Sequence, residues 1–200
     1  SFVGLNALLM RRYMYEYGWE HAAFANFSIN AHANAVHNPN ARFHELINKE
    51  SFSKSPMISD PINLMDASPV SDGAAAIVLS AHPVQNGNRT VSVIASSSMT
   101  DTLSLQNRKI GTRLTAAETS AKAAYAQAGL MPKDITLFEY HDAFSIMAAL
   151  SLEAAGFCDP GKGPQLALDG KIKFDSEIPV ATMGGLKARG HPVGATGIYQ

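Results

Sequence analysis

The sequence predicts an α/β protein in which helices and strands form layers. Two observations favour this class. After residue 89, strand-like and helix-like segments alternate along the chain, an order typical of layered α/β folds. Hydrophobic residues make up 46% and charged residues 16% of the 200 residues, which is a globular composition. This length suits one large domain or two small ones.

The chain opens with an amphipathic segment. Residues 3–17 have helical spacing of apolar side chains, and Gly18 is a plausible stop. The apolar positions that define the expected face are Leu5, Leu8, Leu9 and Met14. The sequence therefore predicts a helix over 3–17.

Residues 21–60 are rich in histidine, asparagine and other polar residues. We expect this stretch to be a loop excursion from the core, with a second short helix near Asn40–Asn48. Prolines at 56, 61 and 69 predict extended or turning backbone with no long helix. The run AAAIVLS at 74–80 then predicts a short buried strand, closed by His82 and Pro83.

The turn signal QNGN at 85–88 is the strongest in the chain and marks a candidate domain boundary. We therefore divide the chain into domains of residues 1–88 and 89–200. The pattern of the second domain predicts strands at 90–99, 135–140 and 178–182, helices at 115–127 and 144–155 that end at Gly129 and Gly156, and a further helix start near Gly194.

Composition narrows the function. Sixteen basic and seventeen acidic residues give a net charge of -1, which does not favour a nucleic-acid partner. The apolar runs are too short to span a bilayer, and no signal pattern is visible. The single cysteine, Cys158, fits a reducing compartment. We expect a soluble, cytoplasmic protein.

The run GHPVGATG at 190–197 follows a predicted strand and precedes a predicted helix. Glycine lets backbone turn sharply and approach other groups closely, so His191 would be held as a base. For an isolated GHP, a helix-capping turn with an incidental surface histidine is the favoured interpretation. The spacing matches neither the P-loop nor the dinucleotide-binding pattern.

A second candidate is EYHDAF at 139–144, at the carboxyl end of a predicted strand, where open α/β folds place ligands. His141 could donate a hydrogen bond to an oxyanion, directly or through water. Asp142 could instead cap the following helix, and the two roles are compatible.

Two other patterns are weaker. Cys158 follows a helix stop and is adjacent to Asp159, whose carboxylate disfavours a thiolate, so a structural role is expected. His32, His37 and His44 lack a matching cysteine or acidic pattern, so we expect a polar loop beside a pocket and no metal site.

Taken together, the motifs resemble the thiolases, in particular the sterol-carrier-protein-type and archaeal-type branch. The resemblance covers nearly all 200 residues. It rests, in order, on SFVGLNALLMRRYMYEYG, NAHANAVHNPNARF, SPMISDPINLMDASPVSDGAAAIVLS, EYHDAF and GGLKARGHPVGATG. It implies a thiolase fold with layered α/β halves (α-β-α-β-α), of which this chain covers only part of each half.

The resemblance also implies roles. His191 would activate a nucleophilic cysteine, and His141, where most thiolases have Asn, would hold an oxyanion-hole water. We further expect His32, Phe144, Gly190 and Gly194 to line the substrate site. Thiolases are about twice this length, so the nucleophile is expected outside these residues and the segment is not expected to be active or to fold alone.

The implied function is an acyl-CoA C-acyltransferase of lipid metabolism that forms or cleaves 3-ketoacyl-CoA through a cysteine acyl-enzyme. Coenzyme A would be substrate, with no cofactor required. Ala181-Thr182-Met183 replaces the branch's usual Asn-Pro-Ser, which leaves two alternatives: a non-catalytic thiolase-like subunit or a related condensing enzyme. Expected partners are a second copy, as homodimer or homotetramer, and a small zinc-containing OB-fold protein. The acyl chain and the reaction direction stay open.

Overall fold

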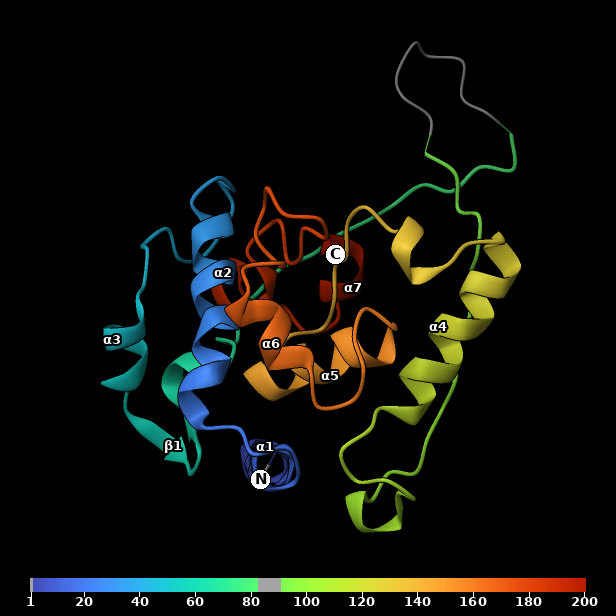
Figure 1. Cartoon of the computed structure of the whole chain (residues 1–200). Helices are drawn as coiled ribbons and strands as arrows, with labels where there is room; N and C mark the ends of the chain where they lie inside the picture. The colour runs from blue at the N-terminus through green and yellow to red at the C-terminus, as the bar shows by residue number, and fades with distance from the viewer. Residues whose placement is uncertain (1, 83–90) are drawn as a thin grey trace.

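The computed structural model describes residues 2–82 and 91–200 (Figure 1). The elements, in order, are α1 (Phe2–Tyr17), η1 (His21–Phe24), α2 (Ala25–Ala35), α3 (Lys49–Ser53), β1 (Met57–Ser59), β2 (Ile62–Asn63), η2 (Leu64–Asp66), η3 (Leu105–Asn107), α4 (Thr115–Ala128), η4 (Pro132–Asp134), α5 (Ser145–Ala154), α6 (Gly163–Leu168), η5 (Gly185–Arg189) and α7 (Thr196–Tyr199). The candidate domain boundary at 85–88 falls outside the described residues.

The core is built around α5. Its sequence SIMAALSLEA consists mainly of small and aliphatic residues, and seven of its ten side chains are buried. Figure 1 shows α5 beside α6, with α1 below them and α2 to one side. Aromatic side chains from α1, η1 and α2 join α5 in one hydrophobic cluster, among them Tyr13, Phe24 and Phe27.

The helices α1, α4 and α5 lie where the sequence predicts them. Gly129 and Gly156 follow α4 and α5 with φ angles of 68° and 81°, a left-handed conformation that glycine adopts without steric cost. The predicted face of α1 is partly wrong. Leu5 and Leu8 are exposed, whereas Leu9, Met10 and Tyr13 are buried against the core.

The expected excursion at 21–60 is wrong for its first part. Residues 21–35 form η1 and α2 and pack into the core, because the apolar side chains between the polar ones, Phe24, Phe27 and Ala31, face inward. The helix expected near Asn40–Asn48 is also misplaced: 40–48 is irregular and α3 begins at Lys49, after Asn48 accepts a hydrogen bond from Ser51 N.

The proline-punctuated stretch turns as expected. β1 and β2 pair antiparallel, with Met57 opposite Asn63, and η2 follows directly. Asn63 and Asp66 then cap each other's backbone N–H groups. This reciprocal pair fixes the chain before it enters the extended segment 67–71.

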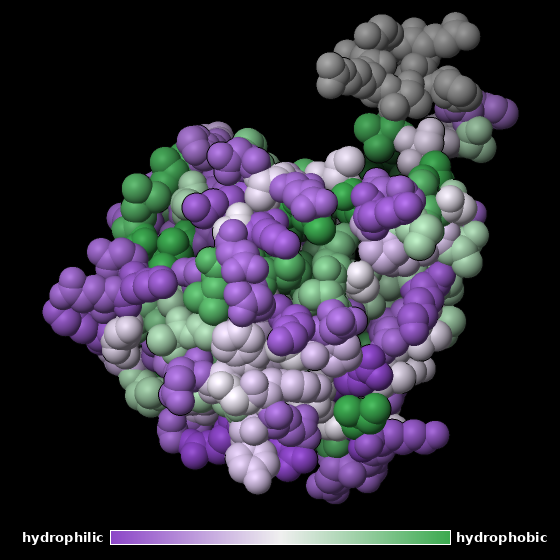
Figure 2. All heavy atoms as spheres, in the orientation of Figure 1, coloured by the Kyte–Doolittle hydropathy of each residue, from purple (hydrophilic) through white to green (hydrophobic). Residues whose placement is uncertain are grey.

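Two predicted strands are wrong, and two are reduced to a single bridge. Residues 74–80 and 91–99 have no regular structure, and Val78 is 94% exposed. In Figure 2 hydrophobic atoms are visible on the extended chain beside the grey atoms. A strand needs a neighbour to complete its backbone hydrogen bonds, and the described residues supply none here.

The segments 135–140 and 178–182 do lie side by side. Phe138 and Val180 form a parallel bridge, with hydrogen bonds of 2.9 Å from Phe138 N to Pro179 O and 3.2 Å from Ala181 N to Phe138 O. This bridge brings the two segments together. The first segment leads directly into the His141 turn, and the second leads through η5 to the His191 turn. In the described part of the chain no helix is both long and apolar enough to cross a bilayer.

Candidate active site

The two predicted site histidines meet in space. The ring centroids of His141 and His191 are 4.9 Å apart and the rings are edge to face. His141 lies on the turn after the Phe138 bridge, and His191 lies on the turn after η5. The structure therefore brings the two candidate histidines into contact, while their chemical roles stay predictions.

One extended segment, residues 67–71, supports both turns. Ser68 N donates to Ala143 O at 2.9 Å, beside His141. Further along, His191 N donates to Pro69 O at 3.1 Å and Ser71 N donates to His191 O at 3.3 Å. The backbone of 67–71 therefore fixes the spacing between the two histidines.

The ring of His191 is oriented by a buried hydroxyl. Its Nδ1 lies 2.9 Å from Thr196 Oγ1, and Thr196 is the first residue of α7. This bond does not use Nε2, which is the ring nitrogen left for a reacting group. The pair of a base and an orienting partner is the arrangement that general-base catalysis requires.

Both histidines favour the neutral form. Partial burial of the ring lowers the pKa of His141 below its usual value. Burial also lowers the pKa of His191, and the neighbouring His141 and Arg189 lower it further because positive charge disfavours protonation. A neutral imidazole can accept a proton at one nitrogen, which is what a base needs.

The turn before His191 is shaped by close backbone contacts. A Cβ at Gly185 would lie 2.4 Å from Asp142 Oδ2, and one at Gly184 would lie 2.7 Å from Ala35 Cβ. Both glycines have positive φ. Only glycine allows this approach, which explains the paired glycines of the motif.

Asp142 bonds the glycine turn. Its buried Oδ1 accepts from Leu186 N at 2.7 Å. α5 begins at Ser145, and in the described part of the chain its N-cap residue, Phe144, forms no side-chain capping bond. The possibility that Asp142 caps the following helix is therefore wrong: Asp142 joins the His141 turn to η5. Burial raises the pKa of Asp142.

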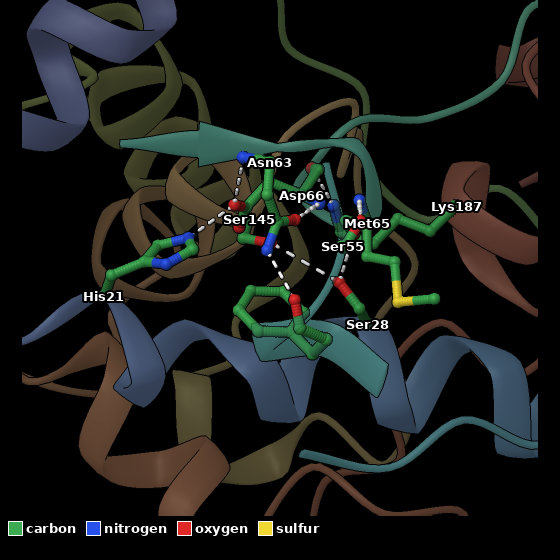
Figure 3. Close-up of polar contacts among 9 residues, drawn as sticks. His21, Ser28, Ser55, Asn63, Met65, Asp66, Ser145 and Lys187 are labelled. Carbon is green, nitrogen blue, oxygen red and sulfur yellow. Dashed lines mark hydrogen bonds and ion pairs between the residues drawn. The ribbon is translucent and has the colours of Figure 1, made fainter. Parts of the chain in front are cut away.

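A polar cluster includes Lys187, Asp66 and His21 (Figure 3). Lys187, in η5, is buried, and its Nζ donates to the backbone oxygen of Asp66. The Asp66 carboxylate in turn lies 2.6 Å from His21 Nε2. Burial lowers the pKa of Lys187 to about 8, although Asp142 and Asp66 oppose that shift. Lys187 thus connects the segment before 67–71 to the His191 turn.

Asparagines of the α2 region hold the segment before the glycines. The amides of Asn30 and Asn34 each donate to Val180 O at 3.0 Å, and Asn38 donates to Met183 O at the same distance. The first two are four residues apart, so they lie on one face of α2. The polar character of this asparagine-rich sequence predicts a loop. In the structure these asparagines instead bond the backbone of the segment before the glycines.

The segment Ala181-Thr182-Met183, which stands where Asn-Pro-Ser is expected, forms hydrogen bonds to Glu139. Thr182 donates to Glu139 Oε1 through both N (2.6 Å) and Oγ1 (2.7 Å). Ala181 has a φ of 52°, a conformation unusual for a residue with a side chain. The side chain of Met183 is exposed.

The other predicted site residues are more scattered. His32 stacks on Phe43 and its Nδ1 lies 3.0 Å from Glu45 O, so its contacts are with the loop after α2. Phe144 is buried beside Phe2. Gly190 lies on the His191 turn with a φ of 111°, and Gly194 is exposed in open space. Their roles in substrate binding stay predictions.

Cys158 is half-buried next to the core. Burial raises its pKa to about 12, and Glu153 and Asp159 add to the rise. A thiol with this pKa is a poor nucleophile at neutral pH, in agreement with the expected structural role. Among the described residues, no three histidine, cysteine or acidic side chains are grouped as metal ligands would be.

Three residues near the histidines were missed: Lys187, Arg189 and Thr196. Each lies inside or next to the glycine-rich run, and each is buried. The sequence held one signal that could have found them: all three are charged or hydroxyl side chains within a few residues of the candidate base His191. Their burial could not be seen in the sequence.

Known proteins resemble this chain over nearly its whole length. Residues 97–200 match the family described as thiolase C-terminal domain-like. The chain is 43% identical over 202 residues to the acetyl-CoA acetyltransferase of Methanothermobacter thermautotrophicus, covering 100% of this chain and 53% of that protein. It is 32% identical over 197 residues to sterol carrier protein 2 of Homo sapiens, covering 95% of this chain and 36% of that protein.

A solved structure, that of an Ltp2-ChsH2(DUF35) aldolase, shares the fold with a TM-score of 0.82 and 24% identity. The match covers 98% of this chain and 53% of the other. At this identity the match shows the fold alone. The chain spans about half the length of the acetyltransferase that it matches.

Proposed function

Because the chain belongs to the thiolase family, we propose that the protein containing it is an acyl-CoA C-acyltransferase that forms or cleaves 3-ketoacyl-CoA. The observation that carries the proposal is the contact between His141 and His191. The match to an acetyl-CoA acetyltransferase supports thiolase chemistry in general, and the histidine pair supplies the groups that such chemistry uses.

His191 is the proposed base. In the cleavage direction, Nε2 takes the proton of a cysteine thiol that lies outside this chain. The thiolate then attacks the 3-keto carbonyl, the bond between C2 and C3 breaks, and acetyl-CoA leaves as an enolate that takes up a proton. Coenzyme A thiolate next attacks the acyl-enzyme thioester and releases the cysteine. A covalent intermediate divides one difficult step into two easier ones.

His141 is the proposed oxyanion donor. A neutral imidazole carries one N–H, and its ring lies against that of His191, so both can reach one oxygen or one shared water. Donors fixed before the reaction stabilise a developing oxyanion without further reorganisation. The lowered pKa of each histidine supports neutral rings, which keeps His191 available as a base.

The proposal includes a protein partner. The structural neighbour pairs Ltp2 with ChsH2(DUF35) in its name, and we extend to this chain a complex with a small zinc-containing OB-fold protein. A homodimer or homotetramer of the chain is also part of the proposal. Size-exclusion chromatography with light scattering, with and without the co-expressed partner, tests both.

Thiolytic cleavage tests the function. The full-length protein is assayed with acetoacetyl-CoA and with longer 3-ketoacyl-CoA thioesters, in the presence of coenzyme A. Release of acetyl-CoA supports an acyltransferase. A folded protein that is inactive with every thioester contradicts it and favours the non-catalytic subunit, with Ala181-Thr182-Met183 as the candidate cause.

A further inference from the structure

Arg189, the last residue of η5, is buried, and its side chain forms no hydrogen bond within residues 2–82 and 91–200. It is 8% exposed, and none of its three guanidinium nitrogens has a partner among the described residues. Its contact with the Tyr199 ring, 5.5 Å from the centroid, satisfies no N–H group. Buried cationic groups are normally paired, so this guanidinium lacks a ligand.

The nearby carboxylates of Glu139 and Asp142 do not hydrogen-bond to the Arg189 guanidinium. Glu139 and Asp142 act on Arg189 through their charges, but Glu139 Oε1 is already bonded to Thr182 and Asp142 Oδ1 to Leu186. Glu139 Oε2 and Asp142 Oδ2 are themselves buried with no hydrogen-bond partner in the described ranges, so neither bonds to the guanidinium. They balance part of its charge and leave its N–H groups free.

Arg189 borders a cavity of about 250 Å³. The polar groups of the lining are Arg189, Arg42, Asn38, Asn40, Ser71 and Asp72. Arg42 is exposed and uses NH1 to bond Val70 O, which leaves its other N–H groups for a ligand. Two arginines against one aspartate make the lining net positive.

The cavity adjoins the His191 turn. Gly190 and Pro192, the two neighbours of His191 along the chain, are part of its lining. A ligand in the cavity would therefore lie next to the turn that carries the proposed base. Its size suits a small group, not a whole acyl-CoA molecule.

We propose that this cavity binds an oxyanion, a carboxylate or a phosphate group, held by Arg189 and Arg42. The planar guanidinium presents paired N–H donors that match both groups. The source of the oxyanion rests on the proposed function: it is a group of the acyl-CoA substrate, either a phosphate of coenzyme A or a carboxylate of the acyl chain.

Direct binding tests the site without turnover. Inorganic phosphate and succinate are titrated by calorimetry into the full-length protein, into Arg189→Met and Arg42→Met, and into Arg12→Met as control. Arg12 is an exposed arginine of α1 whose partner is Glu16. We expect saturable binding in the wild type and the control, and affinity roughly tenfold to a hundredfold lower in the other two variants.

Unchanged affinity in both variants, or no saturable binding to the wild type, overturns the site. If Arg189→Met is destabilised but folded and binds as tightly as the wild type, Arg189 is only a counter-charge for Glu139 and Asp142. If Arg189→Met does not fold, Arg42→Met decides, because Arg42 is exposed and its replacement leaves the core intact.

Kinetics then identify the source. Acetoacetyl-CoA is compared with a 3-ketoacyl-CoA that carries a terminal carboxylate. A KM raised in Arg42→Met for both substrates identifies a coenzyme A phosphate, and one raised for the carboxylated substrate alone identifies the acyl chain. An unchanged KM for both overturns the assignment to the substrate. A wild type that binds phosphate through the arginines but cleaves no thioester refutes the proposed function and leaves the site standing.

Discussion

The imidazole rings of His141 and His191 lie edge to face with centroids 4.9 Å apart, although they come from different turns. The same extended segment, 67–71, bonds the backbone of both turns. Neither histidine can therefore move far without disturbing the other. Because segment 67–71 holds both turns, the effect of each histidine on activity can be measured by replacing one and leaving the other in place.

Replacing His191 tests the base. In the full-length protein, His191→Ala should lower the rate of thiolysis by a factor on the order of 10²–10⁴, the usual contribution of general-base catalysis. Stability should change little because the side chain is half-exposed. His82→Ala, an exposed histidine elsewhere, is the control and should retain activity. Full activity in His191→Ala removes that residue from the mechanism.

Replacing His141 tests the oxyanion donor. His141→Ala should lower turnover roughly 10²–10³-fold, as the loss of one oxyanion-hole donor does. Because the donor acts in the transition state, kcat should fall more than KM rises. Steady-state kinetics with acetoacetyl-CoA separate the two. A variant with a raised KM and a normal kcat would show that His141 only binds substrate.

The dependence of activity on pH tests the neutral base. His191 works unprotonated, so activity is lost as the pH falls through its pKa. Since that pKa is lowered, the acid limb of kcat/KM should lie below pH 6.5. As the pH falls, protonation of His141 opposes protonation of His191, so His141→Asn should move the limb to higher pH. An acid limb that stays in place in His141→Asn contradicts this electrostatic coupling.

Two glycines of the same turn should respond differently to alanine. At Gly190 φ is 111° and a Cβ would lie 2.7 Å from Ser71 Oγ. With ψ at 161°, this backbone lies in a region essentially restricted to glycine, which costs other residues about 1–3 kcal/mol, so Gly190→Ala should lose at least that much stability. Gly194 has open space around it, and Gly194→Ala should unfold at the wild-type denaturant concentration. Equal midpoints for the two variants would refute the account of the turn.

The buried Lys187 should matter for stability. Lys187→Met removes the donor to Asp66 O and the positive charge near Asp142. Leaving a buried acceptor without its hydrogen bond typically costs about 1–3 kcal/mol. Lys54→Met is the matched control, since Lys54 forms an exposed ion pair with Glu50, and such pairs contribute roughly 0–1 kcal/mol. Denaturant unfolding of both variants measures the difference, and similar midpoints would contradict the role of Lys187.

The sequence by itself determined the elements that depend on near neighbours. The helices α1, α4 and α5 follow from apolar spacing within a few residues, and glycines with positive φ follow α4 and α5. The two histidine turns could also be found, because each carries a recognisable motif at the end of a strand-like segment. Helical hydrogen bonds and turn geometry join residues close in the chain, so local patterns predict them.

Only the tertiary structure decided what depends on distant partners. Residues 74–80 and 91–99 have strand-like sequences but no strand neighbour among the described residues, and pairing is not a local property. In the sequence, Asn30, Asn34 and Asn38 are typical of a loop. In the structure their side-chain amides donate to backbone oxygens of residues 180–183. The burial of Lys187 and Arg189 likewise arises from packing between segments far apart in the chain, and it lowers the pKa of both side chains. No described residue hydrogen-bonds to the Arg189 guanidinium.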